Sequence, residues 1–457
     1  MNDVKISTGS AGFVNLLVTE SLGALNDNAF KFFITLMAAG TLPAEQAAKI
    51  IALAGFCFIL PFILFSGFAG TMADKFSKKK MIAVLKLAEL ALMLLSFIPI
   101  YYGNVPFMLL VLFLMGIHSA FFGPVKLAIV PELVADKDLS NGNGLMSMMA
   151  FFGIILGAAS AGVLMSLVHG RYYLAVPFFV AVALAGFVTS LYVPDVEAAG
   201  SAERFRFNIF AKIYSDVKDL QTYVGVYRSQ MAAAYFWFVG AMFQMNILIY
   251  GKELMRAGET MLSVFQVMVA LGIGLGSFVA GRLSKNKVEL GLVPIGALGM
   301  VLFSLALAFS FGSTVYTNAC LFFLGFSCGL FILPLTAFVQ HRSPAEKRGK
   351  FIAVGNILSF TGVLLASGFL WLTSSYFKLD PAQIFIVLAV MTLAVAAHIT
   401  TVVPEFLLRL CVYPVANVIY RIKVLGEENV PLNSGALLVS NHMSFVDAIL
   451  LVGASER

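Results

Sequence analysis

The segment Gly70-Thr-Met-Ala-Asp-Lys-Phe-Ser-Lys-Lys79 separates two long apolar stretches in the first half of the chain, and it has a counterpart in the second half. In that counterpart, Ser277-Phe-Val-Ala-Gly-Arg-Leu-Ser-Lys-Asn286, the alanine, a basic residue, the serine and a lysine recur at the same spacing. Pro124 and Pro334 form a second pair of matching positions, near the ends of the fourth and tenth apolar stretches. These matches predict a chain built from two related halves.

The composition indicates a membrane protein. Of the 457 residues, 60% are hydrophobic and 12% are charged, with a mean hydropathy of +0.93, whereas about a quarter of the residues of soluble domains are charged. An apolar run of 18 or more residues can cross a bilayer core of about 30 Å. We therefore predict an all-α membrane protein with twelve transmembrane helices in two six-helix halves, residues 1–194 and 231–403. The predicted spans are 12–39, 48–70, 81–101, 105–128, 144–168, 172–193, 231–250, 261–281, 290–311, 315–338, 351–373 and 382–403.

Residues 195–230 form a polar linker between the halves. Apolar residues recur in it at helical spacing, namely Phe205, Ile209, Ile213, Val217 and Leu220, which predicts an amphipathic helix on the membrane surface. This linker and the loops that would share its side together hold 18 Lys and Arg residues, against 5 in the loops on the other side. Because cytoplasmic loops carry the excess of Lys and Arg, we predict a cytoplasmic N-terminus.

Three charged residues lie inside the first apolar span. Glu20, Asp27 and Lys31 fall within about 40° of one another on a helix of 100° per residue. A charged side chain near the middle of a membrane costs roughly 2.5–3.5 kcal/mol, so this stripe is expected to face protein or water. We interpret it as one wall of an internal cavity. Alternatively, Asp27 and Lys31 neutralise each other as a structural pair, or Asp27 is a proton-coupling carboxylate.

Ionisable residues within the spans are unevenly shared between the halves. The first half also has Lys86 and Glu89, interpreted as a structural pair, His118 and Lys126. The second half has His398 near a span end, and the neutral Gln244 and Asn246. One polar wall and one apolar wall suit a ligand with a charged end and a long apolar end, and a phosphate and an amine of such a ligand would suit Lys31 or Lys126 and Asp27 respectively.

The segment Gly70–Lys79 resembles the loop 2–3 signature of the major facilitator superfamily, with Ser77 where Gly is usual. The resemblance implies a charge lock on the cytoplasmic side that is broken and remade during alternating access. Its residues would be Asp74, Lys75, Lys78, Lys79 and, in the second half, Arg282. Alternatively, these basic residues only set the topology.

Further motifs resemble the bacterial lysophospholipid transporter (LplT-type) branch of that superfamily. They are Leu25-Asn-Asp-Asn-Ala29, Gly123-Pro-Val-Lys126 with Pro131-Glu-Leu133, Asn143-Gly-Leu145, and Pro334-Leu-Thr-Ala337 with Gln340. The resemblance implies movement of lysophospholipid, such as lysophosphatidylethanolamine, to the cytoplasmic leaflet of a bacterial inner membrane for reacylation. Gln244 stands where this branch has an arginine, so it offers only a neutral hydrogen bond. The predicted substrate-binding residues are Asp27, Lys31, Asn28, Glu20, Lys126 and Gln244.

Residues 404–457 differ in character from the spans. Two strand-like runs precede Asn441-His-Met-Ser-Phe-Val-Asp447, which resembles the first motif of the glycerolipid acyltransferases. In that chemistry His442 would be the general base and Asp447 would orient its imidazole. A full α/β domain of this kind needs on the order of 150 residues. We therefore expect 404–457 to be only the start of an acyltransferase domain, and the chain to be part of a transporter–acyltransferase fusion that catalyses no acyl transfer by itself.

Two other functions stay open at this point. One is an acyltransferase, or an acyl-activating enzyme, that a full-length fusion would contain, and the other is an exporter of drugs or metabolites. No Walker-type phosphate loop is present. We expect a monomer that requires no cofactor or metal and binds no nucleic acid, with lysophospholipid, the bilayer and its own acyltransferase domains as partners.

Overall fold

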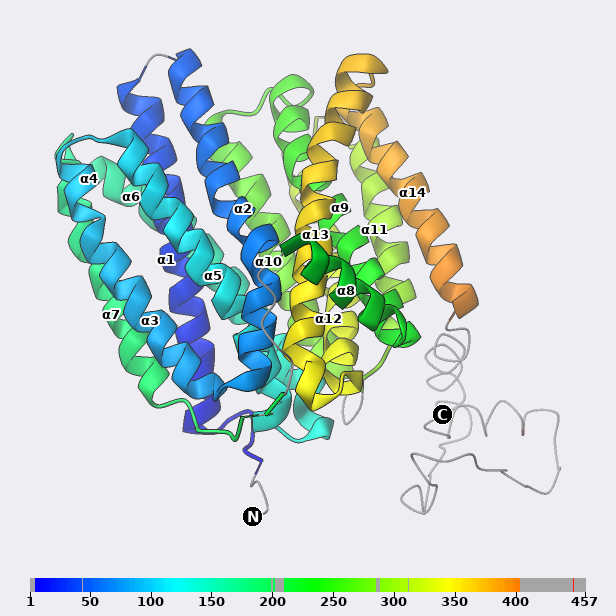
Figure 1. The fold of residues 1–457 in the computed structure, drawn as a ribbon. Coiled ribbons are helices and arrows are strands. Elements are labelled where there is room, and N and C mark those ends of the chain that lie inside the picture. The colour runs from blue at the N-terminus through cyan, green and yellow to red at the C-terminus, as the bar shows by residue number, and fades with distance from the viewer. Residues whose placement is uncertain are drawn as a thin grey trace.

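The computed structural model describes residues 5–402, apart from 43, 199, 202–208, 285–287 and 311, together with Asp447. These residues form an all-helical bundle (Figure 1). The first group of helices is α1 (Ala11–Thr41), α2 (Ala44–Lys75), α3 (Lys78–Leu95), α4 (Phe97–Tyr101), α5 (Val105–Leu133), α6 (Leu139–Val168) and α7 (Val176–Leu191). After α8 (Ile209–Gln221), the second group is α9 (Val224–Glu253), α10 (Glu259–Leu283), α11 (Leu292–Ala308), α12 (Thr314–Arg342), α13 (Arg348–Trp371) and α14 (Pro381–Val402).

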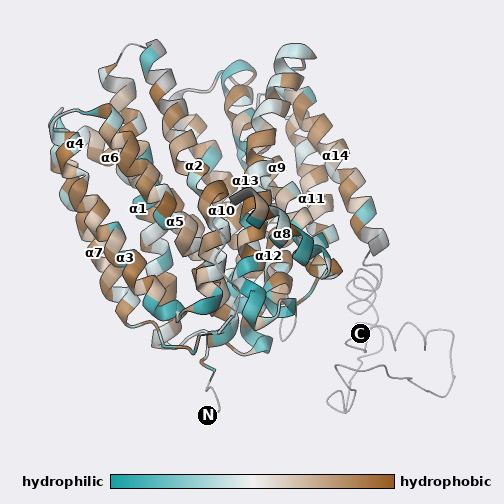
Figure 2. Ribbon diagram, viewed as in Figure 1, coloured by the Kyte–Doolittle hydropathy of each residue, from teal (hydrophilic) through white to brown (hydrophobic). Residues whose placement is uncertain are grey.

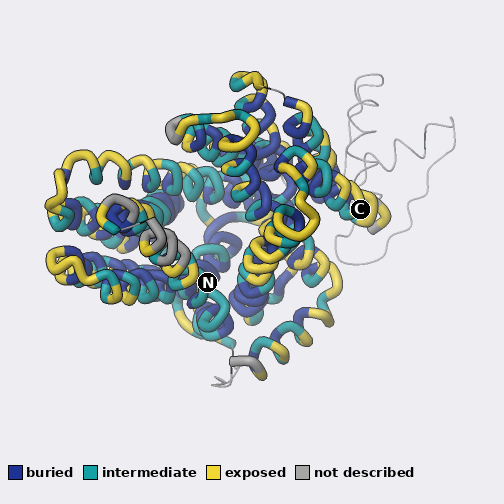
Figure 3. Tube along the Cα trace, turned by 90° about the horizontal axis from the view of Figure 1, so that it is seen from above, coloured by how far each residue is buried: buried dark blue, intermediate teal, exposed yellow. Residues whose placement is uncertain are grey.

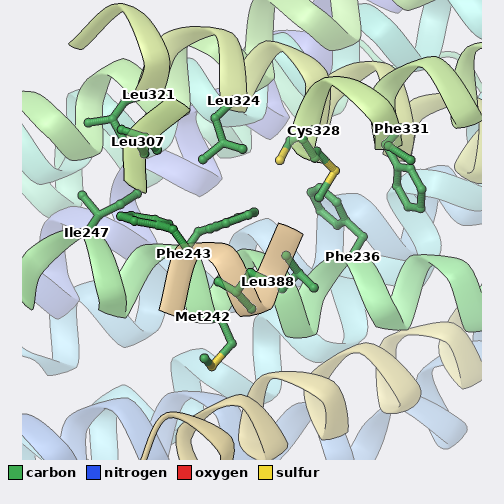
Figure 4. Packing of buried hydrophobic residues seen from close by; sticks show 14 of the residues in the cluster. Phe236, Met242, Phe243, Ile247, Leu307, Leu321, Leu324, Cys328, Phe331 and Leu388 are labelled. Carbon is green, nitrogen blue, oxygen red and sulfur yellow. The ribbon is translucent and has the colours of Figure 1, made fainter. Parts of the chain in front are cut away.

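The two groups stand side by side, and each has its own apolar core (Figure 1). In the second group, side chains of α9 such as Phe243 and Ile247 face Leu324 and Cys328 of α12, with Leu388 of α14 beside them (Figure 4). The groups meet along two seams, where α2 packs against α13 and α6 packs against α10. Both seams therefore pair the second helix of one half with the fifth helix of the other, as expected of two structurally related halves.

The repeat extends to the helix ends. A short 3-10 turn, Asp136–Asp138, joins α5 to α6, and another, Ala345–Lys347, joins α12 to α13. The side chains of Asn104 and Ser313 accept hydrogen bonds from backbone N–H groups in the first turns of α5 and α12. Such caps satisfy N–H groups that a helix cannot pair internally.

Each of the twelve predicted spans falls on a helix, with one difference. The third span is divided into α3 and α4 at Ser96, because Pro99 has no N–H to continue the hydrogen-bond ladder and the Ser96 hydroxyl donates to the Met93 carbonyl at 2.6 Å. Ten helices of the described residues are long and apolar enough to cross a membrane, and α11 is a shorter apolar helix. The helix α1, which carries the three charges, is not among the ten.

The linker contains the predicted helix, α8, but its contacts differ from the predicted pattern. Leu220 is buried, whereas Ile213 and Val217 are only partly buried. The fully buried polar residues are Lys212 and Asp216, which form an ion pair of 2.9 Å, and the stem of Lys212 lies next to Gly67 of α2. The side of α8 that faces the bundle is therefore partly ionic, which the spacing of apolar residues could not predict.

Hydrophobic residues cover most of the long helices, and hydrophilic residues gather at the lower end in Figure 2. Seen from above, buried positions lie where helices contact one another and exposed positions lie on the outer flanks (Figure 3). The predicted strands of residues 404–457 lie outside the described residues, and so does His442 of the acyltransferase motif. Asp447 is the one residue of this motif that the structure describes, so the structure does not test the motif.

The closest helix packing is between α10 and α12. A Cβ atom on Gly276 would collide with the Phe326 backbone, and one on Gly329 would collide with the backbone of Ser277 and Ile273. Glycines at these positions let the two backbones approach, as is common between membrane helices. By contrast, nothing lies within 4 Å of a Cβ atom built on Gly368 of α13.

We expect Gly276→Leu to destabilise the protein, because overpacking a close helix contact costs about 1–3 kcal/mol. The matched control is Gly368→Leu, which adds the same side chain at an open helical position. Thermal unfolding in detergent should show a lower midpoint for Gly276→Leu and an unchanged or higher midpoint for Gly368→Leu. Equal midpoints for the two variants would contradict the packing described here.

Candidate functional site

Two of the three residues in the charged stripe of α1 bind side chains of α5. Glu20 is 2% exposed, and its carboxylate accepts a hydrogen bond of 2.6 Å from the ammonium group of Lys126. The Lys126 side chain keeps a quarter of its surface exposed. Two of the predicted substrate-binding residues are thus brought together as an ion pair between α1 and α5.

Asp27 has one satisfied and one unsatisfied carboxylate oxygen. Its Oδ2 atom accepts a 2.6 Å hydrogen bond from the hydroxyl of Ser119 on α5. Its Oδ1 atom is buried and has no hydrogen-bond partner within the described part of the chain. A buried acceptor without a donor costs free energy, so Asp27 retains the capacity to bind a cationic or hydrogen-bonding group.

Lys31 makes no ion pair with Asp27, so the two side chains do not form the structural pair considered above. The Lys31 ammonium donates a long hydrogen bond of 3.3 Å to the Asn28 side chain and lies 5.1 and 5.4 Å from the ring centres of Phe32 and Phe58. Asn28 in turn donates to the Ala24 carbonyl. Lys31 thus has aromatic and neutral partners but no carboxylate in the described residues, which leaves its charge available to an anion.

A second buried cluster connects α1, α3 and α5. Glu89 accepts hydrogen bonds from Lys86 at 2.8 Å and from Asn26 at 2.9 Å, and the His118 ring lies 3.7 Å from it. Lys86 is fully buried beneath Phe122. These contacts tie the three helices together, while the Asn26 Oδ1 and His118 Nε2 atoms are buried without a hydrogen-bond partner in the described part of the chain.

The second half offers few charges to the interior. Every Asp, Glu, Lys and Arg of α9–α14 lies within the first or last five residues of its helix. Gln244 is exposed on α9. Its backbone carbonyl accepts a hydrogen bond from the side-chain amide of Gln266 on α10. Asn246 is buried and donates to the Pro381 carbonyl. The uneven distribution seen in the sequence is therefore retained in the folded chain.

The halves are joined at the end of the bundle where α2 ends and α13 begins. The Asp74 carboxylate accepts hydrogen bonds from the backbone N–H groups of Gly349 and Lys350, at 2.6 and 2.8 Å. These N–H groups belong to the first turn of α13 and have no partner within their own helix. The carboxylate also lies at the positive end of the α13 dipole. We call this contact between Asp74 and α13 the gate.

Further contacts surround the gate. Lys78, fully buried, donates to Glu132 at 2.6 Å, and Glu132 lies 3.8 Å from Arg348 at the start of α13. Asn143 of α6 and Gln340 of α12 exchange two hydrogen bonds, of 2.7 and 2.9 Å. The Glu132–Arg348 and Asn143–Gln340 contacts cross between the halves at the gate end, whereas Lys78 and Glu132 both belong to the first half.

The predicted lock residues divide into two sets. Asp74 and Lys78 belong to the gate and its surroundings. Lys75 and Lys79 are half-buried at the ends of α2 and α3, and Arg282 is exposed and stacks over Phe278 of its own helix at 4.8 Å. Ser77, at the position where Gly is usual, caps α3 by accepting from the Lys80 N–H.

Asp74 has no carboxylate counterpart in the repeat. The matching residue is Gly281 of α10, and a Cβ atom there would collide with Ser140 and approach Asn141 at the start of α6. The α6–α10 seam is therefore joined by close backbone packing, whereas the α2–α13 seam combines such packing, at Gly70 and Gly349, with the hydrogen bonds of the Asp74 carboxylate.

The linker helix is attached to the gate. Asp219 of α8 forms ion pairs with Lys347 at 2.9 Å and with Lys350 at 2.6 Å. Partial burial would raise the pKa of Asp219, but the hydrogen bonds from Lys350 and Lys347 outweigh it and lower this pKa. Asp219 thus remains ionised at neutral pH.

The sequence profile of the Major Facilitator Superfamily matches residues 16–367. The chain belongs to this superfamily. It is 27% identical over 372 residues to a protein named lysophospholipid transporter LplT from Salmonella enteritidis, with 79% of this chain and 88% of the relative covered. A protein of the same name from Enterobacter sp. is 28% identical over 371 residues, with the same coverage of both chains.

Solved structures of the superfamily share the fold. The human organic anion transporter MFSD10 (TETRAN) superposes with a TM-score of 0.69 at 13% identity, covering 83% of this chain and 98% of that one. FucP in its outward conformation superposes with a TM-score of 0.67 at 13% identity, covering 85% and 98%. The fold, the apolar helices and the family together make this chain a multi-pass membrane protein of transporter type.

Several residues of the site were not singled out from the sequence. Ser119 is a neutral residue in apolar surroundings, and only its partner, Asp27, identifies it. Asn26, Glu132 and Gln340 appeared in the quoted motifs without a role. Gln340 acquires one from Asn143, at a sequence distance of 197 residues, which no local pattern predicts.

We expect Asp74→Asn to loosen the gate. An amide has one acceptor oxygen and no charge, so it loses one of the two N–H contacts and the interaction with the helix dipole, together worth about 1.5–3 kcal/mol. Spin labels at the exposed positions Lys80 and Glu346 should show a longer and broader distance distribution by double electron–electron resonance. The same labels in Asp380→Asn, a matched change at the other end of the bundle, should not. An unchanged distribution in Asp74→Asn would contradict this role.

We expect the attachment of α8 to be constant between pH 6 and 8. A carboxylate with a lowered pKa stabilises the folded contact above its ordinary pKa of about 3.9 and loses this effect only as the pH falls through its folded value. Amide hydrogen exchange of α8, corrected for intrinsic rates, should be unchanged over this range and faster in Asp219→Asn. Glu346→Gln, an exposed neighbouring carboxylate, is the control. Protection that falls markedly from pH 8 to pH 6 would refute the assignment.

Proposed function

We propose that this chain transports lysophospholipids, such as lysophosphatidylethanolamine, across a bacterial inner membrane to the cytoplasmic leaflet. The observation that carries the proposal is the contrast between the two halves. Charged groups lie deep in α1, α3 and α5, whereas the charges of α9–α14 are confined to helix ends. A small hydrophilic solute would need polar contacts from both sides, but an amphiphile needs them from one.

The headgroup partners follow from the unsatisfied groups of α1. Lys31, without a carboxylate partner in the described residues, suits the phosphate, and the free Oδ1 atom of Asp27 suits the amine. Asn28 supports Lys31, and the Glu20–Lys126 pair would border the same wall. Gln244 would contribute a neutral contact from the second half. The acyl chain would lie against the apolar side.

The similar proteins support the same substrate class, since those from Salmonella and Enterobacter carry the name lysophospholipid transporter. Movement across the membrane would proceed by alternating access, with the gate opening to release lipid on the side rich in Lys and Arg. That side is the cytoplasmic side in our proposal, with the N-terminus on it, and one chain would suffice for a complete carrier.

An acyltransferase function is the second candidate, favoured by His442 and Asp447 in the sequence. We propose instead that the acyl transfer belongs to an acyltransferase domain of which 404–457 is only the start. The chain would then deliver the substrate that such an enzyme reacylates.

Vesicles containing the purified protein test both candidates. Fluorescent lysophosphatidylethanolamine is added to the outer leaflet, from which albumin can extract it. Lipid that has crossed the membrane resists this extraction, and the resistant fraction should grow faster in vesicles that contain the protein than in empty vesicles. No acylated product should form when an acyl donor is added. Robust acylation would favour the enzyme, and extraction kinetics equal to those of empty vesicles would remove the lipid proposal.

We expect Asp27→Asn to lower this transport rate about tenfold or more, since the lost charge–headgroup hydrogen bond is worth roughly 1.5–3 kcal/mol. The control is Glu253→Gln, an exposed carboxylate at the end of α9, which should transport at the wild-type rate. Equal rates at equal protein levels for Asp27→Asn and wild type would show that Asp27 binds no substrate.

A further inference from the structure

A cavity of about 370 Å³ opens within the second half, away from the contact between the halves. It is lined by residues of α9, α12 and α14 and by the start of α11, and no described residue of α1–α7 takes part. Its volume lies within the range of ligand pockets in proteins, about 300–1,000 Å³. The first residues of α9 and the last residues of α14 border it, so it lies at the gate end of the bundle.

The floor and the walls of this cavity are apolar. Leu290, Val293 and Leu335 are buried beneath it, and Val395 and Ile399 of α14 are partly exposed along it. Tyr235 lines its deeper part, with its hydroxyl bound to Thr392 at 2.9 Å. Apolar groups therefore dominate the interior, which suits a hydrocarbon chain.

The outer end of the cavity is cationic. Arg228 and His398 line it, both are exposed, and Arg228 has no ion-pair partner among the described residues. Arg228 and Tyr235 are seven positions apart on α9, which is about 10 Å along a helix. A guanidinium binds a phosphate through two parallel hydrogen bonds. The cavity thus combines an anion-binding end with an apolar groove about two helical turns long.

The flank beside the cavity faces hydrocarbon. On α14, Val390 is 60% exposed and Leu393 is 49% exposed, and in a membrane-spanning helix such side chains contact acyl chains. A soluble anion would leave the apolar floor unfilled. A membrane lipid satisfies both parts at once, and basic pockets between helices at a membrane surface are known to bind anionic headgroups.

We infer that this cavity is a second lipid site, which binds the phosphate of an anionic phospholipid at Arg228 and one of its acyl chains along Val293 and Val395. The lipid comes from the leaflet at the gate end. The site is separate from the charged wall of α1, and the inference does not depend on which solute crosses between the halves.

Native mass spectrometry of the protein in nanodiscs containing phosphatidylglycerol tests the site. Wild type should retain bound phosphatidylglycerol, and Arg228→Gln should retain about tenfold less, whereas Arg342→Gln should match wild type. Arg342 is the matched control, because it is an exposed arginine at the same end of the bundle that does not line the cavity. Equal retention by Arg228→Gln and wild type would overturn the inference, as would equal retention of phosphate-free diacylglycerol.

Photo-crosslinking gives an independent readout if Arg228→Gln lowers stability. A photoreactive residue at Val395, in the cavity, should crosslink phosphatidylglycerol in wild type and much less in Arg228→Gln. The same residue at Leu393, on the open flank, should crosslink equally in both. If inorganic phosphate lowers the crosslinking at Val395 but added phosphatidylglycerol does not, the site binds a free anion, and the assignment of a lipid is refuted. Identical behaviour at the two positions would show ordinary boundary lipid and would also refute it.

Discussion

The contact between Asp74 and the first turn of α13 is the constraint on which the arrangement of the halves depends. A helix begins with N–H groups that lack partners, and in a membrane protein such groups need acceptors more than they do in water. The carboxylate of Asp74, from the other half of the chain, supplies acceptors for two of these N–H groups. Both groups would lose their partners if the halves separated there. Asp219, Lys78 and Glu132 place further charges around the same helix end.

The charges in the first half fall into satisfied and available groups. Glu89, Lys86 and Asn26 bind one another and hold α1, α3 and α5 in place. Glu20 and Lys126 form a pair at one edge. Asp27 and Lys31 are then left with unsatisfied capacity on the same helix. The structure thus separates groups that build the wall from groups that can act on a ligand, although their residue types are the same.

The fold was predictable from the sequence because a membrane-spanning helix needs only length and apolarity, and both are local properties. The repeat predicted two related halves, and the resemblance of Gly70–Lys79 to a family signature drew attention to Asp74. What local patterns could not predict were pairings across long sequence distances, such as Asn143 with Gln340, and polar burial such as Lys212 with Asp216. Arg282 shows the limit of the repeat, since it matches Lys75 in sequence but stacks on Phe278 within its own helix.

The replacement of Asp74 by Gly281 in the repeat gives the two seams different physical sensitivities. Separating α2 from α13 breaks charge-assisted hydrogen bonds, whose strength depends on protonation and on the local dielectric. Separating α6 from α10 breaks backbone packing around Gly144 and Gly281, which depends on how closely the two helix surfaces fit. Two similar halves are therefore joined asymmetrically, because the seam of α2 and α13 adds the charge-assisted hydrogen bonds of Asp74 to its glycine packing, whereas the seam of α6 and α10 has Gly281 in place of that carboxylate.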